Sequence, residues 1–248
     1  MDDEKWTLEQ TNKFKNKMGI SVPLIVYTHT DMKDVWPMFF GQLKKYIGDT
    51  KIYVAVNEDD IQLPGYTKII YDDSMAYTDR WKYILTQIKE DVFMFIHEDM
   101  VLFDEPKIDY INKYSNLVKS SKAGSIKLIY VPANDIVSDI DETLISNEYS
   151  KLSIQPTILR KDYFTSVLNE VGSLNIWDFE RAIQIDTKSY MVKVGGEKKR
   201  GIYHCDSIVF PYIATAISKG KWNMSEYSKE LDKMFTEYGV VPFERGVV

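Results

Sequence analysis

The sequence feature that most constrains this chain is an apolar run, residues 92–96, that stops at His97, Glu98 and Asp99. The run contains aromatic and β-branched residues and no polar residue, which is the pattern of a strand buried on both faces of a parallel sheet. Ligands of open α/β sheets bind beyond the carboxyl ends of the strands. Glu98 and Asp99 are therefore expected where a hard cation and a phosphate-bearing substrate could meet. The alternative is an ordinary strand followed by a solvated acidic turn.

Strand-like and helix-like segments alternate from residue 22 to residue 131. Strands are expected at 23–27, 51–56, 67–71 and 125–131, with helices after Asp34, after Ser74 or Thr78, and after Pro106. This alternation predicts an α/β fold, namely a Rossmann-like, mainly parallel sheet flanked by helices. Beyond residue 131 we expect an irregular acidic loop at 133–150, a strand at 152–154, helices at 161–171, 177–185, 211–218 and 225–238, and a hairpin formed by 190–194 and 202–209.

Composition narrows the class of protein. The chain has 248 residues, a length that suits one large α/β domain. Its net charge is −6 and no basic face is evident, which disfavours a nucleic-acid partner. No apolar run is long enough to span a bilayer. A polar arm is expected over residues 1–19, and its residues 1–17 are too polar and charged to resemble a secretory signal. The single cysteine, Cys205, allows no internal disulfide, so we expect a cytoplasmic protein.

Polar residues follow three of the expected strands. The residues expected to face a nucleotide are Thr28, His29, Asp31, Glu58, His97 and Glu98 at the strand ends, together with Arg80 from a following helix. Because the carboxyl ends of parallel strands share one edge, these strand ends are expected to meet there. Arg80 either reaches the diphosphate or pairs with Asp72, Asp73 or Asp79. Neither a Gly-x-Gly-x-x-Gly motif nor a phosphate-binding loop is present, so a cation is expected to neutralise the phosphates.

These motifs resemble those of glycosyltransferases of the GT-A fold. In that family an Asp-x-Asp-like motif at a strand end holds Mn²⁺ or Mg²⁺ on the diphosphate of a nucleotide-sugar, and His97-Glu98-Asp99 is the matching stretch. Residues 153–161 and 176–180 are also similar to bacterial and viral members. The resemblance covers roughly residues 22–222. It implies metal-dependent transfer of a sugar from a nucleotide-sugar donor to a saccharide or another hydroxyl acceptor.

The resemblance also implies roles for individual residues. It places the cation on Asp99, Glu98 and His204, and it places the acceptor near Arg160 and Trp177. Residues 139–141 spell a literal Asp-x-Asp, but no apolar strand precedes them. This second acidic motif is the alternative metal site.

A candidate catalytic base lies in Trp177-Asp178-Phe179-Glu180. An inverting transferase needs a carboxylate that takes the proton of the attacking hydroxyl. On a helix, Asp178 and Glu180 point to nearly opposite sides, whereas Trp177 and Glu180 share a side. We favour Glu180 over Asp178 as the base, with Trp177 as a platform for a sugar ring. In the alternative, Trp177 and Phe179 belong to the core and Glu180 pairs with a basic residue.

We expect one domain over residues 1–248. It would contain a nucleotide-binding half (20–131), an acceptor-binding half (132–224), and a C-terminal helix and tail (225–248). One alternative function is nucleotidyl transfer, which also uses acidic strand ends and a cation but expects a Gly-rich basic loop where this chain has residues 28–31, Thr-His-Thr-Asp. Another is a non-catalytic protein that binds a nucleotide or a carbohydrate on the same scaffold.

Overall fold

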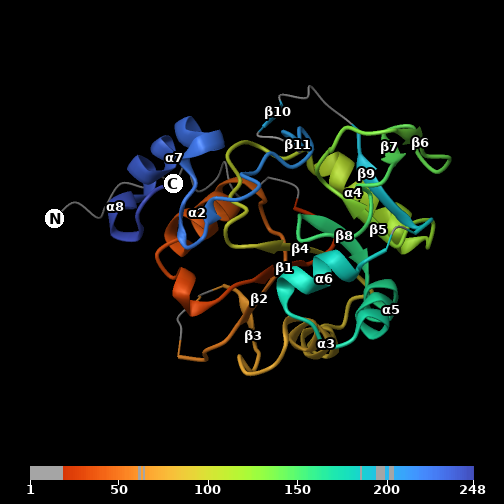
Figure 1. Ribbon diagram of the computed structural model, residues 1–248, viewed down its shortest axis with the longest axis horizontal. Coiled ribbons are helices and arrows are strands. Elements are labelled where there is room, and N and C mark those ends of the chain that lie inside the picture. Colours follow the sequence, from red (N-terminus) through yellow and green to blue (C-terminus); the bar gives the residue numbers. More distant parts are fainter. Residues whose placement is uncertain (1–18, 61–62, 64, 185, 194–198, 201–203) are drawn as a thin grey trace.

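In the computed structural model, a nine-stranded sheet with the order β3-β2-β1-β4-β8-β5-β9-β7-β6 forms the centre of the molecule (Figure 1). The structure describes residues 19–60, 63, 65–184, 186–193, 199–200 and 204–248. The strands of this sheet are β1 (Leu24–Tyr27), β2 (Ile52–Val56), β3 (Thr67–Ile70), β4 (Val92–His97), β5 (Ser125–Lys127), β6 (Ile136–Val137), β7 (Leu144–Ser146), β8 (Thr157–Arg160) and β9 (Ser189–Val192). Two small sheets pair β10 (Lys199–Arg200) with β11 (His204–Cys205) and β12 (Ile217–Ser218) with β13 (Lys221–Trp222).

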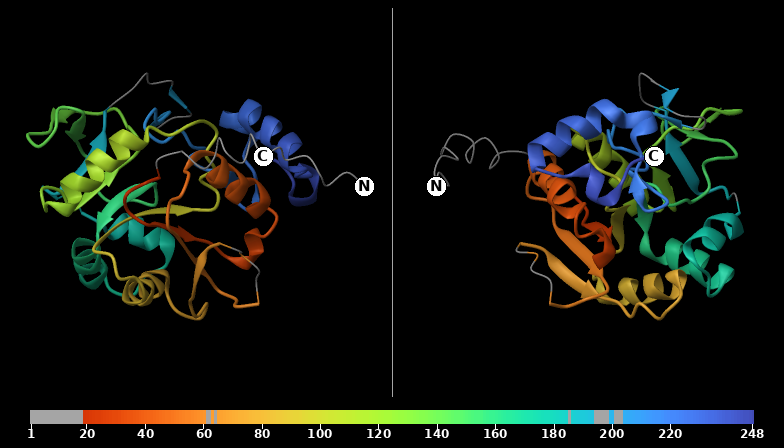
Figure 2. Two further views of the ribbon diagram at one scale, coloured as in Figure 1. Left: turned by 180° about the vertical axis from the view of Figure 1, so that it is seen from behind. Right: turned by 60° about the vertical axis from the view of Figure 1, so that its left-hand side comes forward.

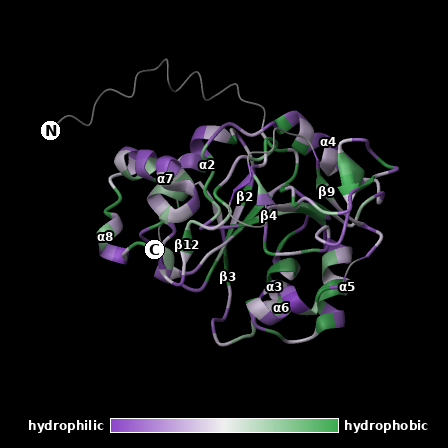
Figure 3. Cartoon of the chain, turned by 45° about the horizontal axis from the view of Figure 1, so that its top comes forward, coloured by the Kyte–Doolittle hydropathy of each residue, from purple (hydrophilic) through white to green (hydrophobic). Residues whose placement is uncertain are grey.

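Helices cover both faces of the central sheet. They are η1 (Thr30–Met32), α2 (Trp36–Tyr46), α3 (Tyr77–Gln87), α4 (Ile108–Lys119), α5 (Lys161–Val171), α6 (Ile176–Ala182), α7 (Met224–Tyr238) and α8 (Pro242–Arg245). In Figures 1 and 3, α2, α4 and α7 lie on one side of the sheet and α3, α5 and α6 on the other. The predicted α/β fold with a mainly parallel sheet flanked by helices is confirmed. No helix in the described part of the chain is long and apolar enough to cross a membrane.

The parallel strands β2, β1 and β4 form the buried centre of the sheet. Every residue of these three strands is buried, as the apolar runs in the sequence predict. β1 pairs in parallel with both neighbours, so Tyr27 lies beside Ala55 on one side and beside His97 on the other. The carboxyl ends of the three strands therefore share one edge, which we call the carboxyl edge.

Strands β7 and β8 run against the direction of the other strands. β8 lies between β4 and β5, and its last residue, Arg160, is paired with Val92 at the start of β4. Arg160 therefore lies at the edge opposite the carboxyl edge. Helix α5 follows at once and ends at Gly172, whose φ of 77° falls in the left-handed region that favours glycine.

An aromatic core attaches α3, α5 and α6 to the sheet. The ring of Trp81 in α3 lies 5.4 Å from the rings of both Phe95 in β4 and Phe164 in α5, measured between centroids. Phe179 of α6 lies 5.8 Å from Tyr77 of α3. These contacts fix the short helix α6 close to the end of β4. Figure 2 shows from two further directions how closely α3 and α5 approach each other.

Several sequence predictions are wrong in detail. The strand expected at 125–131 ends at Lys127, and the helix expected at 177–185 ends at Ala182. Residues 190–194 and 202–209 do not form a hairpin, because β9 joins the central sheet beside β5 whereas β11 pairs with β10. Residues 211–218 are not a helix, since their backbone bonds the segment after β4. Residues 152–154 are not a strand, and the strand begins at Thr157 instead. The expected loop at 133–150 contains the β6–β7 hairpin. The polar arm expected over residues 1–19 lies outside the described residues except for Gly19.

Candidate active site

The carboxyl edge begins with Thr28, the residue directly after β1. Its backbone N–H donates to the carbonyl of Ala55, and its buried hydroxyl accepts from the indole N–H of Trp36 at 2.8 Å. The hydroxyl also hydrogen-bonds Glu98, which favours the ionised form of that carboxyl. Thr28 thus links the end of β1 to the acidic residues after β4.

Glu98 and Asp99 form an acid pair in a poorly solvated place. Burial raises the pKa of Glu98 well above its usual value, and the neighbouring Asp99 raises it further. Burial also raises the pKa of Asp99 to about 7. The Oε2 atom of Glu98 is buried and has no hydrogen-bond partner in the described part of the chain. A buried carboxylate oxygen without a partner is costly, and a bound cation would remove that cost.

These two carboxylates suit a hard divalent cation, because Mg²⁺ and similar ions prefer oxygen ligands and often bind one or two carboxylates together with substrate phosphates. No group of three or more His, Cys, Asp or Glu side chains within the described residues could hold a metal ion on its own. Two adjacent carboxylates are a donor set that fits a divalent cation whose other ligands come from outside the protein.

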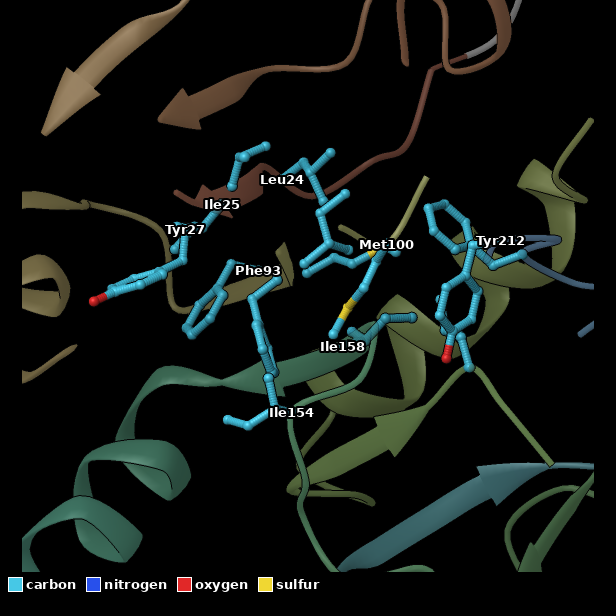
Figure 4. Close-up of a cluster of buried hydrophobic side chains, with 14 of the residues drawn as sticks. Leu24, Ile25, Tyr27, Phe93, Met100, Ile154, Ile158 and Tyr212 are labelled. Atoms are coloured by element: carbon cyan, nitrogen blue, oxygen red, sulfur yellow. The ribbon is translucent and has the colours of Figure 1, made fainter. Parts of the chain in front are cut away.

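The backbone around the acid pair is held firmly. The carbonyl of Asp99 accepts from the amide of Ala216 at 2.9 Å, and the carbonyl of Val101 accepts from Ile213 at 2.8 Å. Met100 is buried directly after the pair, and Figure 4 shows it in the same cluster as Tyr212 and the strand residues Leu24 and Phe93. The segment that we expected to be a helix, 211–218, thus forms the support of the acid pair.

His97 is a buried, neutral neighbour of the acid pair. Burial lowers its pKa to about 3, so its ring carries no charge near neutral pH. Its Nε2 atom lies 3.1 Å from the hydroxyl of Tyr77, and its ring stacks on Tyr27 with 5.0 Å between centroids. Burial raises the pKa of Tyr77, and the carboxylates of Glu180 and Glu98 add to this shift. Tyr77 is therefore within electrostatic reach of both the acid pair and the predicted base.

The structure brings His29, Asp31 and Glu58 to the same edge, where they are more exposed. The amide of Asp31 donates to Nδ1 of His29 at 3.1 Å, and Nε2 of that ring lies 3.2 Å from a carboxylate oxygen of Asp73. The hydroxyl of Thr30 donates to Glu58 at 2.9 Å, which lowers the pKa of that carboxyl. These contacts tie the loops after β1, β2 and β3 together.

Arg80 pairs with an aspartate, which is the second of the two roles expected for it from the sequence. Its guanidinium forms an ion pair with Asp73 at 2.9 Å and also bonds the backbone carbonyl of that residue. Further donors reach the carbonyl of Met75 at 2.9 Å and the hydroxyl of Tyr27 at 3.1 Å. Arg80 therefore holds the loop before α3 in place.

Arg245, at the end of α8, is a cation of this edge that the sequence analysis missed. It lies close enough to Glu98 to favour the ionised form of that carboxyl. Its guanidinium bonds both carboxylate oxygens of Asp34 and, at 2.8 Å, the carbonyl of Asp31. No local pattern in the sequence could place a residue so far along the chain against the end of β1.

Helix α6 presents the candidate base. Asn175 caps the helix by accepting from the amides of Trp177 and Asp178 at 3.0 Å each. The carboxylate of Asp178 accepts from Asn175 at 2.7 Å and pairs with Arg181, whereas Glu180 accepts from the amide of Ile154 at 2.7 Å.

The two aromatic residues of this motif differ in environment. Trp177 is 67% exposed, and Phe179 is buried in the aromatic core. The alternative in which both belong to the core therefore holds for Phe179 alone. α6 therefore carries one exposed indole ring, that of Trp177.

The structure does not bring Arg160 to the carboxyl edge. Because β8 is antiparallel to β4, this residue lies at the opposite edge, where it pairs with Asp162. It lines a cavity of about 1030 Å³ there, together with Glu90 and Lys161. This cavity is separated from the acid pair by the length of β4.

His204 and the second acidic motif also have other surroundings. His204 lies 3.2 Å from the hydroxyl of Tyr227, in a cluster with Asp206. In the second acidic motif, Asp141 pairs with Lys113 at 2.7 Å and accepts from the amide of Thr143. Among the described residues, neither stretch contributes to a group that could hold a metal ion on its own.

A buried lysine near Glu180 gives a prediction about pH. Burial lowers the pKa of Lys127 to about 7, with Lys151 lowering and Glu180 raising it. Between that value and its ordinary pKa of 10.5, the unfolded chain binds a proton that the folded chain lacks, so stability should rise with pH. Lys127→Met should lose this contribution. Urea unfolding of both proteins between about pH 7 and about pH 10 measures the difference, and a difference that does not change with pH would contradict the prediction.

Comparison with known proteins finds structural matches only. No family model matches this chain. No curated protein matches it in sequence. Among solved structures, the bifunctional IspDF from Campylobacter jejuni matches at 17% identity and a TM-score of 0.41, over 76% of this chain and 52% of its own. An apo UDP-glucose pyrophosphorylase matches at 8% identity and a TM-score of 0.42, over 88% of this chain and 98% of its own.

The glycosyltransferase GlyE of Streptococcus pneumoniae matches at 9% identity and a TM-score of 0.37, over 60% of this chain and 38% of its own. The matches thus include a protein described as a glycosyltransferase and one described as a UDP-glucose pyrophosphorylase. This chain spans about half the length of the Campylobacter jejuni protein. At such low identity the likeness concerns the fold, and the residues of the site have to indicate the function.

Proposed function

We propose that this protein is a metal-dependent glycosyltransferase that uses a nucleotide-sugar donor. The observation that carries the proposal is the acid pair at the end of β4, in which Glu98 has a buried carboxylate oxygen without a hydrogen-bond partner among the described residues. Asp99 and Glu98 would hold Mn²⁺ or Mg²⁺ together with the donor diphosphate. When bound, such a cation stabilises the negative charge that grows on a departing diphosphate.

The other residues of the carboxyl edge would bind the nucleotide. These residues are Thr28, His29, Asp31 and Glu58, on the loops after β1 and β2, which the hydrogen bond from Thr30 to Glu58 joins. The contact between His29 and Asp73 ties the loop after β3 to them. His97 would contribute a buried, neutral ring beside the acid pair, and its contact with the hydroxyl of Tyr77 fixes that ring. Arg80 would act indirectly in this proposal, by fixing the loop before α3.

The acceptor would lie beside α6. Trp177 offers an exposed aromatic face. Glu180 offers a carboxylate close enough to the hydroxyl of Tyr77 to raise its pKa, as Glu98 also does. The base would take the proton of the acceptor hydroxyl. The oxygen of that hydroxyl would attack the anomeric carbon while the nucleoside diphosphate departs. Asp178 is engaged with Asn175 and Arg181, which favours Glu180 in this role.

One assay separates this proposal from its two alternatives. The protein is incubated with UDP-, GDP- and dTDP-sugars and Mn²⁺, and both the melting temperature and the products are measured. We expect a metal-dependent rise in melting temperature, because a ligand that binds the folded state stabilises it, together with release of a nucleoside diphosphate. Formation of a nucleoside triphosphate and a sugar phosphate when pyrophosphate is added would identify a nucleotidyltransferase. Stabilisation without any turnover, with a range of saccharide acceptors present, would identify a binding protein.

A further inference from the structure

We propose that Lys127, at the end of β5, is a positioning residue that aims the carboxylate of Glu180 through the loop formed by residues 149–154. This inference rests on the proposed role of Glu180 as the base. Lys127 is 4% exposed, and its Nζ atom bonds three oxygens that all belong to this loop. They are the carbonyl of Tyr149, the carbonyl of Lys151 at 3.2 Å and the hydroxyl of Ser153 at 3.2 Å.

Buried lysines are rare because the amine must find acceptors in place of water. Lys127 finds all of them in one short loop, so the side chain determines where that loop lies against the sheet. The ammonium form has a donor for each of the three oxygens, and the neutral amine still has two for the carbonyls and a lone pair that can accept from the hydroxyl of Ser153.

The loop in turn bonds two groups of α6, namely backbone carbonyls at the end of the helix and the carboxylate of Glu180. The Nζ atom of Lys151 donates to the carbonyls of Glu180 and Ile183 at 3.2 Å each, where the helix ends. The amide of Ile154 donates to Oε1 of Glu180 at 2.7 Å. One oxygen of the carboxylate is thereby fixed, and the other can accept a proton from a substrate.

This chain of contacts ends at the candidate base and does not pass through the acid pair. A general base works only within hydrogen-bond reach of the proton it removes, so a loose loop would lower turnover. Binding of the donor at the carboxyl edge would not change, because none of the contacts of Lys127 belongs to the loops after β1 and β2.

The test compares Lys127→Met with Lys161→Met. Both changes remove an amine bonded to backbone carbonyls, but Lys161 donates to Ile88 at the opposite edge, at 2.8 Å. In Lys127→Met we expect kcat to fall about 10²-fold, the effect of a misplaced catalytic group, with an unchanged KM for the donor. We also expect faster hydrogen exchange at the amide of Ile154, measured by NMR. Lys161→Met should change neither quantity.

The exchange measurement decides the inference independently of turnover. Unchanged exchange at Ile154 in a folded Lys127→Met protein would overturn it, and so would faster exchange with unchanged kcat. If Lys127→Met does not fold, Lys151→Met replaces it. The side chain of Lys151 is only partly buried, and it donates to a backbone carbonyl of the same helix. A wild-type protein without turnover on any nucleotide-sugar would count against the proposed function, while exchange at Ile154 would still show whether Lys127 holds the loop.

Discussion

Asp99→Asn should reduce sugar transfer by roughly 10³-fold or more while the protein stays folded. A bound cation contributes several kcal/mol of charge stabilisation to a departing diphosphate, and the neutral amide of Asn is a much weaker ligand for it. The fold should tolerate the change, because burial already disfavours the ionised form of Asp99 and raises its pKa to about 7. Steady-state turnover with Mn²⁺ and the melting temperature measure the two effects.

Asp139→Asn is the matched control for this experiment. Asp139 is exposed and belongs to the second acidic motif, so its replacement should leave turnover unchanged. A large loss in Asp139→Asn with normal turnover in Asp99→Asn would move the metal site to that motif. Full activity of Asp99→Asn in the presence of a chelator would exclude the proposed role of the acid pair. For the wild-type protein, chelator should abolish transfer, and added Mn²⁺ should restore it.

Glu180→Gln should lower turnover by roughly 10²–10⁴-fold, the usual contribution of general-base catalysis, with donor binding nearly unchanged. The glutamine carbonyl can still accept from the amide of Ile154, which is 2.7 Å from the carboxylate in the wild-type protein. The change therefore removes the base and keeps its position. Turnover and the KM for the donor, measured with a saccharide acceptor, give the result.

Asp178→Asn is the control on the same helix. Its carboxylate pairs with Arg181 at 3.2 Å and accepts from Asn175, so we expect a small change in turnover. Normal turnover of Glu180→Gln together with a large loss in Asp178→Asn would reverse the two roles. Normal turnover in both variants would remove this motif from the chemistry.

The apolar periodicity of the sequence predicted the centre of the fold well. β4 begins and ends within one residue of the run at 92–96, because a strand buried on both faces leaves a continuous apolar signal. The helix at 161–171 was predicted with its observed bounds, since its apolar positions recur at helical spacing and Gly172 follows it. Local patterns of this kind do not depend on distant parts of the chain.

Segments whose structure depends on distant partners were predicted less well. Residues 211–218 have an apolar pattern compatible with a helix, but Val101 and Asp99 provide the hydrogen-bond partners of Ile213 and Ala216. β9 resembled half of a hairpin, yet it pairs with β5, more than sixty residues earlier in the chain. In both cases, tertiary hydrogen bonds replaced the local structure that the sequence favours.

The same distinction applies to the site. Residues at strand ends, such as Thr28 and Glu98, were expected together because parallel strands share an edge, and the structure brings them together. Arg160 was linked to the acceptor by resemblance alone, and the reversed direction of β8 places it at the other edge. Arg245 could not be predicted, since its place depends on how the end of the chain packs against Asp34.

The contact between Arg245 and Asp34 joins residues that are 211 positions apart. A ribosome makes the turn after β1 early and α8 late, so the growing chain can pair β1, β2 and β4 long before this guanidinium arrives. Contacts between residues so far apart in sequence add to the share of non-local contacts, which lowers folding rates in general. During synthesis, the acidic end of β4 therefore exists without its cationic neighbour until α8 has been made.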